Sequence, residues 1–161
     1  MASDFAAMFE SHYRRVVRAL ELGGLDHASA EDAAQEAFAR TLGHWRRVRR
    51  GSNPPGYVFR TAFRLARRQL ASREIPLGEV PMPANDAPGG ELRMDVEAEL
   101  ALMPARRRAC AVLCLVVGMS TAEAASALGI AEGTVRKQLE HARRRLRLVL
   151  SEESPPAPPS P

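Results

Sequence analysis

Apolar residues recur every three or four positions along the first half of the chain, a spacing that indicates amphipathic helices. The predicted helices span residues 4–22, about 29–48 and about 55–73. Gly23 ends the first helix, Asp26 or Ser29 can cap the second, and Pro55 suits the start of the third. On the second helix, the apolar side is expected to comprise Ala30, Ala37, Phe38, Thr41, Leu42 and Trp45.

The pattern changes after residue 74. Residues 75–91 hold four prolines and several glycines with few apolar anchors, a composition typical of a flexible linker. Helical spacing resumes near Leu92, and Pro104 opens a further helix that Gly118 ends. The last residues, SEESPPAPPSP, cannot form a core and are expected to be disordered.

These patterns predict an all-α fold made of two small helical domains joined by a flexible linker. The N-terminal domain should be a bundle of three to four helices, and the C-terminal domain should contain a helix-turn-helix. The predicted segments are a first domain at 1–74, an acidic linker at 75–93, a second domain at 94–150 and a tail at 151–161.

Residues 120–150 carry the most specific pattern. A short helix capped by Ser120 is followed by a turn at Gly129 and a longer helix from about Ala131. The longer helix buries one apolar stripe, so its opposite side is expected to face solvent. That side and its flanks carry Arg136, Lys137, Glu140, His141, Arg144 and Arg147. We interpret this as a DNA-binding helix-turn-helix; a solvated basic helix is the alternative.

Composition limits the classes of function. The 161 residues are 45% hydrophobic but only 5% aromatic, so the core must be built from Ala, Leu and Val. No apolar run is long enough for a membrane span, and the N-terminal residues do not resemble a secretion signal, so we expect a cytoplasmic protein without membrane insertion. Nothing resembles a phosphate loop, a metal cluster or a nucleophile with its base, so we expect no enzyme activity and no cofactor.

Charge divides the chain into blocks. Residues 1–74 carry a net charge of +5, residues 75–103 carry −5 and residues 104–150 carry +6. Of the 23 cationic residues, all but Lys137 are arginines, which bind phosphates and guanine edges in a bidentate manner. Two basic blocks around an acidic connector indicate two modules that face a polyanion.

Several segments in both halves of the chain carry specific motifs. They are AEDAAQEAF (30–38), HWRRV (44–48), PPGYVFRTAFRLARR (54–68), ALMPARRRA (101–109), STAEAASALGIAE (120–132) and GTVRKQLEHARRRLR (133–147). In their order and spacing, these segments resemble the extracytoplasmic-function group of bacterial sigma factors, which consist of two helical domains. The resemblance implies a subunit that binds RNA polymerase core and directs promoter-specific initiation. A free-standing helix-turn-helix regulator is the alternative, and a helical protein-interaction module is a third possibility.

The resemblance also implies roles for individual residues. Asp32, Gln35 and Glu36 would dock a basic coiled coil of the largest polymerase subunit, and the second domain would meet the flap of the second-largest subunit. The minus-ten element would be read by Arg46, Arg47, Arg49, Arg50, Tyr57, Arg60 and Arg64. The minus-thirty-five element would be read by Thr134, Arg136, Lys137, Gln138, His141 and Arg144. An anti-sigma factor is a further expected partner.

Three positions depart from the family pattern. Arg64 stands where relatives often have Asn, Lys137 where many have Ser, and His141 where many have Arg. We expect these departures to keep the fold and to alter the promoter sequence that is preferred, although the sequence does not give that promoter.

Some side chains have two interpretations. A flipped base could stack on Trp45, Tyr57, Phe59 or Phe63, but Trp45 lies on the apolar side of its helix, which favours core packing. Glu140 could accept a hydrogen bond from cytosine, but an ion pair with Arg136 or Arg144 is favoured.

Cys110 and Cys114 lie among small apolar residues, so we expect buried hydrophobic side chains rather than a metal or redox pair.

Overall fold

The computed structural model describes residues 2–72 and 90–152. Every regular element in these two stretches is a helix, which confirms the predicted all-α fold. None of the described helices is long and apolar enough to cross a membrane. Most of the expected linker at 75–93 and of the expected tail at 151–161 lies outside the described residues. The remainder of each prediction was wrong, because residues 90–93 belong to one helix and residues 151–152 to another.

The N-terminal helices form one group around a shared core. They are α1 (Ala2–Leu22), α2 (His27–Gly43), α3 (Trp45–Val48) and α4 (Pro54–Ser72). The side chains of Val16, Leu20, Ala34 and Val58 are at most 1% exposed, so α1, α2 and α4 contribute to one interior. Asp26 caps α2 as expected, since its Oδ1 accepts from the Ser29 amide at 2.9 Å.

The second predicted helix is interrupted. α2 ends at Gly43, and α3 begins at Trp45 after His44 adopts φ −110° and ψ 12°. Glycine is a weak helix former, so a break at Gly43 is physically reasonable. Trp45 is 8% exposed and its ring centroid lies 5.3 Å from that of Phe5, which confirms its place in the core. Leu42 was expected on the apolar, core-facing side of this helix. That expectation was wrong, because its side chain is 54% exposed.

The C-terminal helices form the second group. They are α5 (Gly90–Leu102), α6 (Ala105–Ala111), the π-helical turn η1 (Val112–Val116), α7 (Thr121–Leu128) and α8 (Glu132–Glu152). The π-helical turn was not expected; the sequence predicted one continuous helix there. Leu113, Val135 and Leu139 are at most 2% exposed and form part of the interior of this group.

The helix-turn-helix pattern is present as predicted. Ser120 and Glu123 form a capping box at the start of α7, with the Ser120 Oγ accepting from the Glu123 amide at 3.1 Å. Gly129 ends α7 with φ 65° and ψ 36°, a left-handed conformation that favours glycine. The long helix α8 then starts at Glu132.

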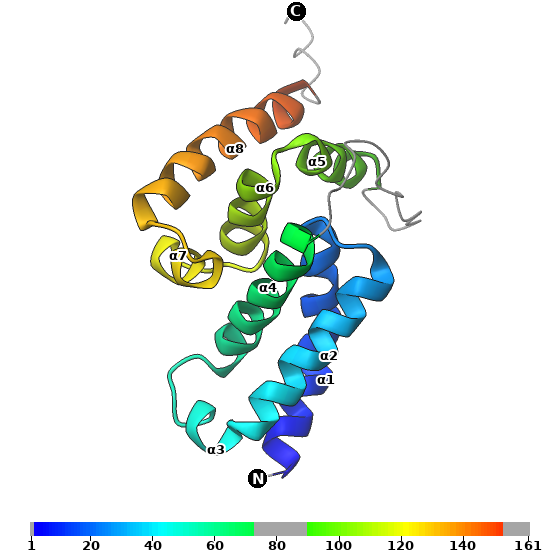
Figure 1. Cartoon of the computed structure of the whole chain (residues 1–161). Coiled ribbons are helices and arrows are strands. Elements are labelled where there is room, and N and C mark those ends of the chain that lie inside the picture. The colour runs from blue at the N-terminus through cyan, green and yellow to red at the C-terminus, as the bar shows by residue number, and fades with distance from the viewer. Residues whose placement is uncertain (1, 73–89, 153–161) are drawn as a thin grey trace, which may run out of the picture.

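The two groups of helices pack against each other (Figure 1). Helix α7 lies on α4, and the end of α1 meets η1 and α5. The sequence predicted two helical domains but gave no indication of this contact, because it depends on side chains that are far apart along the chain.

Burial predicts how two leucines in η1 differ in their effect on stability. Leu113→Ala should lower the free energy of unfolding by about 3 kcal/mol, because its side chain is fully buried. Leu115→Ala is the matched control, since Leu115 is 41% exposed, and it should cost less than about 1 kcal/mol. Urea unfolding followed by circular dichroism measures both, and equal losses would contradict the placement of this turn.

Candidate polymerase and nucleic-acid interface

One face of α2 is exposed and partly acidic. Asp32, Gln35 and Glu36 all lie in solvent, as expected from the helical wheel. Glu36 pairs with Arg40 one turn later at 2.6 Å, whereas Asp32 makes no ion pair with any residue in the described stretches. Leu42 continues the same stripe, because positions 32, 35, 39 and 42 repeat at helical spacing. This face therefore combines a free carboxylate, an amide and an apolar side chain.

Leu42 was missed as a candidate from the sequence. Its apolar character placed it with the core, and only its 54% exposure shows that it joins the polar face. The helical spacing itself carries a signal for this, because position 42 falls on the same side of α2 as the polar positions 32 and 35.

The arginines after Trp45 lie in α3 and in the loop that follows it, and this segment is called the arginine loop. Arg46, Arg47, Arg49 and Arg50 are all exposed, and the Arg49 Nη1 lies 3.5 Å from Oδ2 of Asp4. The loop returns to α4 through Asn53, whose Oδ1 accepts from the Gly56 amide at 2.9 Å. A Cβ on residue 56 would clash with this Asn53 side chain, so glycine permits the close approach.

An open pocket of about 560 Å³ lies beside this loop. Its lining includes Trp45, Arg49, Arg50 and Pro55, together with residues of α1. The indole Nε1 of Trp45 is buried and has no hydrogen-bond partner in the structure. A buried donor without a partner is costly, but this Nε1 is itself shielded and is not offered to the open pocket.

The solvent side of α4 carries the remaining predicted minus-ten residues. The Arg60 guanidinium lies 5.9 Å from the centroid of the Tyr57 ring, and both side chains are half-buried. Arg64 is exposed, but its Nη2 donates to the Ser126 carbonyl of α7 at 3.2 Å. Phe59 and Phe63 are each 3% exposed, so the expectation that they could stack on a base was wrong.

On α8, the predicted minus-thirty-five residues are divided between free and paired side chains. Lys137 is exposed and makes no ion pair or hydrogen bond with residues of the described stretches. Arg136 is also exposed and pairs with Glu132 at 2.7 Å. Gln138 is half-buried, where its Oε1 accepts from Arg107 Nε at 3.1 Å, so it is tied to the interior of the group.

The other α8 candidates lie on the same helix. Thr134 and His141 are half-buried, whereas Arg144 is exposed. Arg144 Nη2 donates to Glu140 at 2.8 Å, which confirms the favoured ion-pair interpretation of Glu140 and identifies Arg144 rather than Arg136 as its partner.

A hydrogen bond fixes the angle between the two helices of the motif. The Thr121 hydroxyl at the start of α7 donates to Oε1 of Glu132 at the start of α8, at 2.7 Å. This bond lowers the pKa of Glu132, with a smaller contribution from Arg136. A carboxylate near a helix N-terminus is also stabilised by the helix dipole. The contact holds α8 so that its Arg136 and Lys137 face solvent.

Comparison with known families matches both groups of helices. The family model for sigma-70 region 2 matches residues 8–74, and that for sigma-70 region 4 matches residues 93–146. ECF RNA polymerase sigma factor SigL of Mycobacterium tuberculosis is 34% identical, with 94% of this chain and 91% of SigL covered. The chain belongs to the ECF sigma factors.

Other relatives differ in length and identity. SigE of Mycolicibacterium smegmatis is 31% identical over 91% of this chain, and the chain spans 62% of SigE. The solved structure of the sigma factor RpoE from Bartonella quintana, in complex with the anti-sigma factor NepR, superposes with a TM-score of 0.75. It is 21% identical and covers 93% of this chain and 98% of that one, so it shows the shared fold.

The two cysteines of this ECF sigma factor are free thiols in region 4. Cys110 is fully buried, and burial raises its pKa to about 11. Cys114 is half-buried, and burial raises its pKa as well. A raised thiol pKa favours the protonated form, which is a poor nucleophile and metal ligand. Both side chains therefore act as small hydrophobic residues in this environment.

This burial predicts slow thiol chemistry. At pH 8, Cys110 of the folded chain should resist a thiol-specific reagent such as DTNB, and Cys114 should react first. Both thiols should react promptly once urea unfolds the chain. Peptide mapping of the labelled sites measures the order, and rapid labelling of Cys110 in the folded chain would contradict its burial.

Proposed function

We propose that this ECF sigma factor binds the RNA polymerase core and directs it to promoters, with region 2 at the minus-ten element and region 4 at the minus-thirty-five element. The observation that carries the proposal is the separation of three exposed surfaces on one chain. These surfaces are the acidic face of α2, the arginine loop after Trp45 and the polar face of α8. The proposed role involves no catalysis by this chain. It places the protein in the cytoplasm, together with the polymerase.

The α2 face suits a basic partner. Asp32 presents a carboxylate without an ion-pair partner in the described stretches, and Leu42 adds exposed apolar area on the same stripe. Opposite charge speeds and orients association, whereas a desolvated apolar side chain contributes much of the affinity. This combination supports docking of Asp32, Gln35 and Glu36 on the basic coiled coil of the largest subunit, with Leu42 as an added contact.

A second polymerase contact is proposed on region 4. Exposed leucines lie on α5 and at the end of α8, two helices that pack together and are joined by an ion pair between Arg145 and Glu99 at 3.0 Å. The exposed leucines are Leu102, Leu148 and Leu150. An apolar surface of this kind fits the flap of the second-largest subunit better than it fits DNA.

For the minus-ten element, the loop arginines would neutralise phosphates while the adjacent pocket receives an unstacked base. Extruding a base costs a few kcal/mol, which contacts in a pocket must offset. Arg49 and Arg50 offer charge at the edge of the pocket, which Trp45 and Pro55 also line. Arg46, Arg47, Tyr57, Arg60 and Arg64 are proposed to hold the strand on either side.

For the minus-thirty-five element, α8 would enter the major groove with its N-terminal half. Lys137 and Arg136 are exposed near the start of the helix, where a recognition helix contacts base edges. Thr134 and the helix N-terminus would bind phosphate, and Gln138, His141 and Arg144 lie further along the helix. An anti-sigma partner is also proposed, because the similar structures include CnrH in complex with the cytosolic domain of CnrY.

Run-off transcription with purified core polymerase on genomic promoter fragments tests the proposed function. The chain should produce discrete transcripts, and Asp32→Lys should reduce them at least about tenfold by weakening core binding. Glu10→Lys, the same charge change on an exposed part of α1, is the control and should have little effect. Operator binding without polymerase, together with an absence of transcripts, would instead indicate a free-standing regulator.

Two further substitutions separate the DNA contacts. Lys137→Ala should weaken promoter use by about 1–3 kcal/mol in a manner that depends on the minus-thirty-five sequence. Arg46→Ala should impair promoter opening more than closed-complex binding, since its region holds unwound DNA. Permanganate footprinting and filter binding measure the two steps, and equal effects of both substitutions on both steps would contradict these roles.

A further inference from the structure

A cavity of about 400 Å³ lies where four segments of the chain meet. They are the end of α1 with the turn after it, the second half of α4, one face of α6 and the turn between α7 and α8. Sites for small ligands commonly enclose about 300–1,000 Å³, so this cavity is large enough for one small molecule. Its lining residues are distinct from those proposed to contact the promoter and the polymerase.

The walls of the cavity are apolar. Leu20, Leu25, Phe63 and Leu128 line it and are each at most 6% exposed, and Ile130 is half-buried beside them. Among the described residues that line the cavity, none has a hydroxyl, amide or carboxylate side chain. A ligand with several polar groups would leave them without hydrogen-bond partners, which is costly away from water. The wall therefore suits a molecule whose body is apolar.

Two arginines lie where the cavity meets solvent, since Arg67 and Arg106 both line it and are both exposed. Arg67 donates to the Leu128 carbonyl. Arg106 makes no hydrogen bond or ion pair with any residue of the two described stretches, so its guanidinium is available to an anion. Guanidinium groups form strong, charge-assisted hydrogen bonds with carboxylates. The mouth of the cavity is therefore complementary to a carboxylate.

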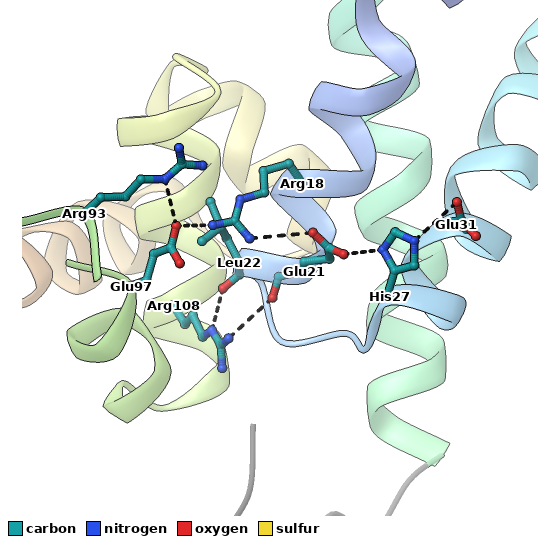
Figure 2. Close-up of polar contacts among 8 residues, drawn as sticks. All are labelled: Arg18, Glu21, Leu22, His27, Glu31, Arg93, Glu97 and Arg108. Atoms are coloured by element: carbon teal, nitrogen blue, oxygen red, sulfur yellow. Dashed lines mark hydrogen bonds and ion pairs between the residues drawn. The ribbon is translucent and has the colours of Figure 1, made fainter. Parts of the chain in front are cut away.

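Contacts outside the cavity fix the segments that form it (Figure 2). The Nε of Arg108 in α6 donates to the Leu22 carbonyl at 2.5 Å, and its Nη2 donates to the Glu21 carbonyl at 3.5 Å, which joins α6 to the end of α1. Arg18 of α1 also forms an ion pair with Glu97 of α5. A ligand that enters a preformed site loses less binding energy to the ordering of the protein.

We propose that this cavity binds a free monocarboxylic acid with an apolar body, such as a medium-chain fatty acid. The apolar body lies against the leucines and Phe63, and the carboxylate binds Arg106 at the mouth. Arg67 adds a second positive charge there. The site is separate from the proposed promoter contacts, so its occupation can be measured without polymerase or DNA.

The measurement is isothermal titration calorimetry of the full-length chain with decanoate, below the concentration at which decanoate forms micelles. Decanoate should bind saturably, with one molecule per chain. Butyrate has the same carboxylate on a much shorter chain and should show no measurable binding, because it buries far less apolar surface.

Two substitutions test the two halves of the site. Arg106→Gln should weaken decanoate binding about fivefold, because it removes the charge but keeps most of the side chain, at a mouth that solvent partly screens. Arg14→Gln makes the same change at an exposed arginine of α1 that does not line the cavity, and it should leave the affinity unchanged. Ala109→Phe should abolish binding by filling the cavity, and thermal unfolding shows whether this variant remains folded.

The proposal is overturned if decanoate does not bind saturably, if it binds as many molecules per chain, or if Arg106→Gln and Arg14→Gln have equal effects. Undiminished binding to folded Ala109→Phe would also contradict it. Anionic phospholipid presents similar chemistry from a membrane, so co-sedimentation with phosphatidylglycerol vesicles, without binding of decanoate, would reject the free acid. Run-off transcription needs no ligand, so its result decides the proposed function separately.

Discussion

Arginine side chains that reach the carbonyl ends of helices bond the two groups of helices to each other. Arg108 from region 4 donates to carbonyls in the last turn of α1, and Arg64 and Arg67 from region 2 donate to carbonyls in the last turn of α7. Each region thus supplies cations to a helix C-terminus of the other. The last carbonyls of a helix lack partners within it, so these contacts satisfy the Leu22, Ser126 and Leu128 carbonyls, which would otherwise need water. The Glu21 carbonyl also accepts from the Gly24 amide at 3.0 Å.

This use of arginine connects the fold to the function. The guanidinium group binds helix carbonyls and phosphates through similar geometry, so the arginines of α4 suit either kind of acceptor. Burial separates structural from binding arginines: Arg108 is 8% exposed, and desolvation lowers its pKa, whereas Arg64 remains exposed. Asp32 on α2 and Lys137 on α8 take no part in these contacts and are exposed.

Local sequence signals predicted the helices and the helix-turn-helix well. Asp26, Ser120 and Gly129 act through contacts within a few residues, so their effects on helix ends can be derived from the sequence. Leu42 and Arg64 were harder: Leu42 is apolar but lies on the exposed side of α2, and the partner of Arg64 lies 62 residues away. Contacts between regions leave no periodic pattern, so no helical wheel reveals them.

The most direct test of the packing between the two groups of helices in the free chain is energy transfer between one dye in region 2 and one in region 4. The exposed positions Glu10 and Arg147 can carry the dyes in a chain whose two cysteines are replaced by alanine. Transfer should be high for the free chain and should fall when core polymerase is added. Low transfer in the free chain, or the same high transfer in the complex with core, would contradict the account.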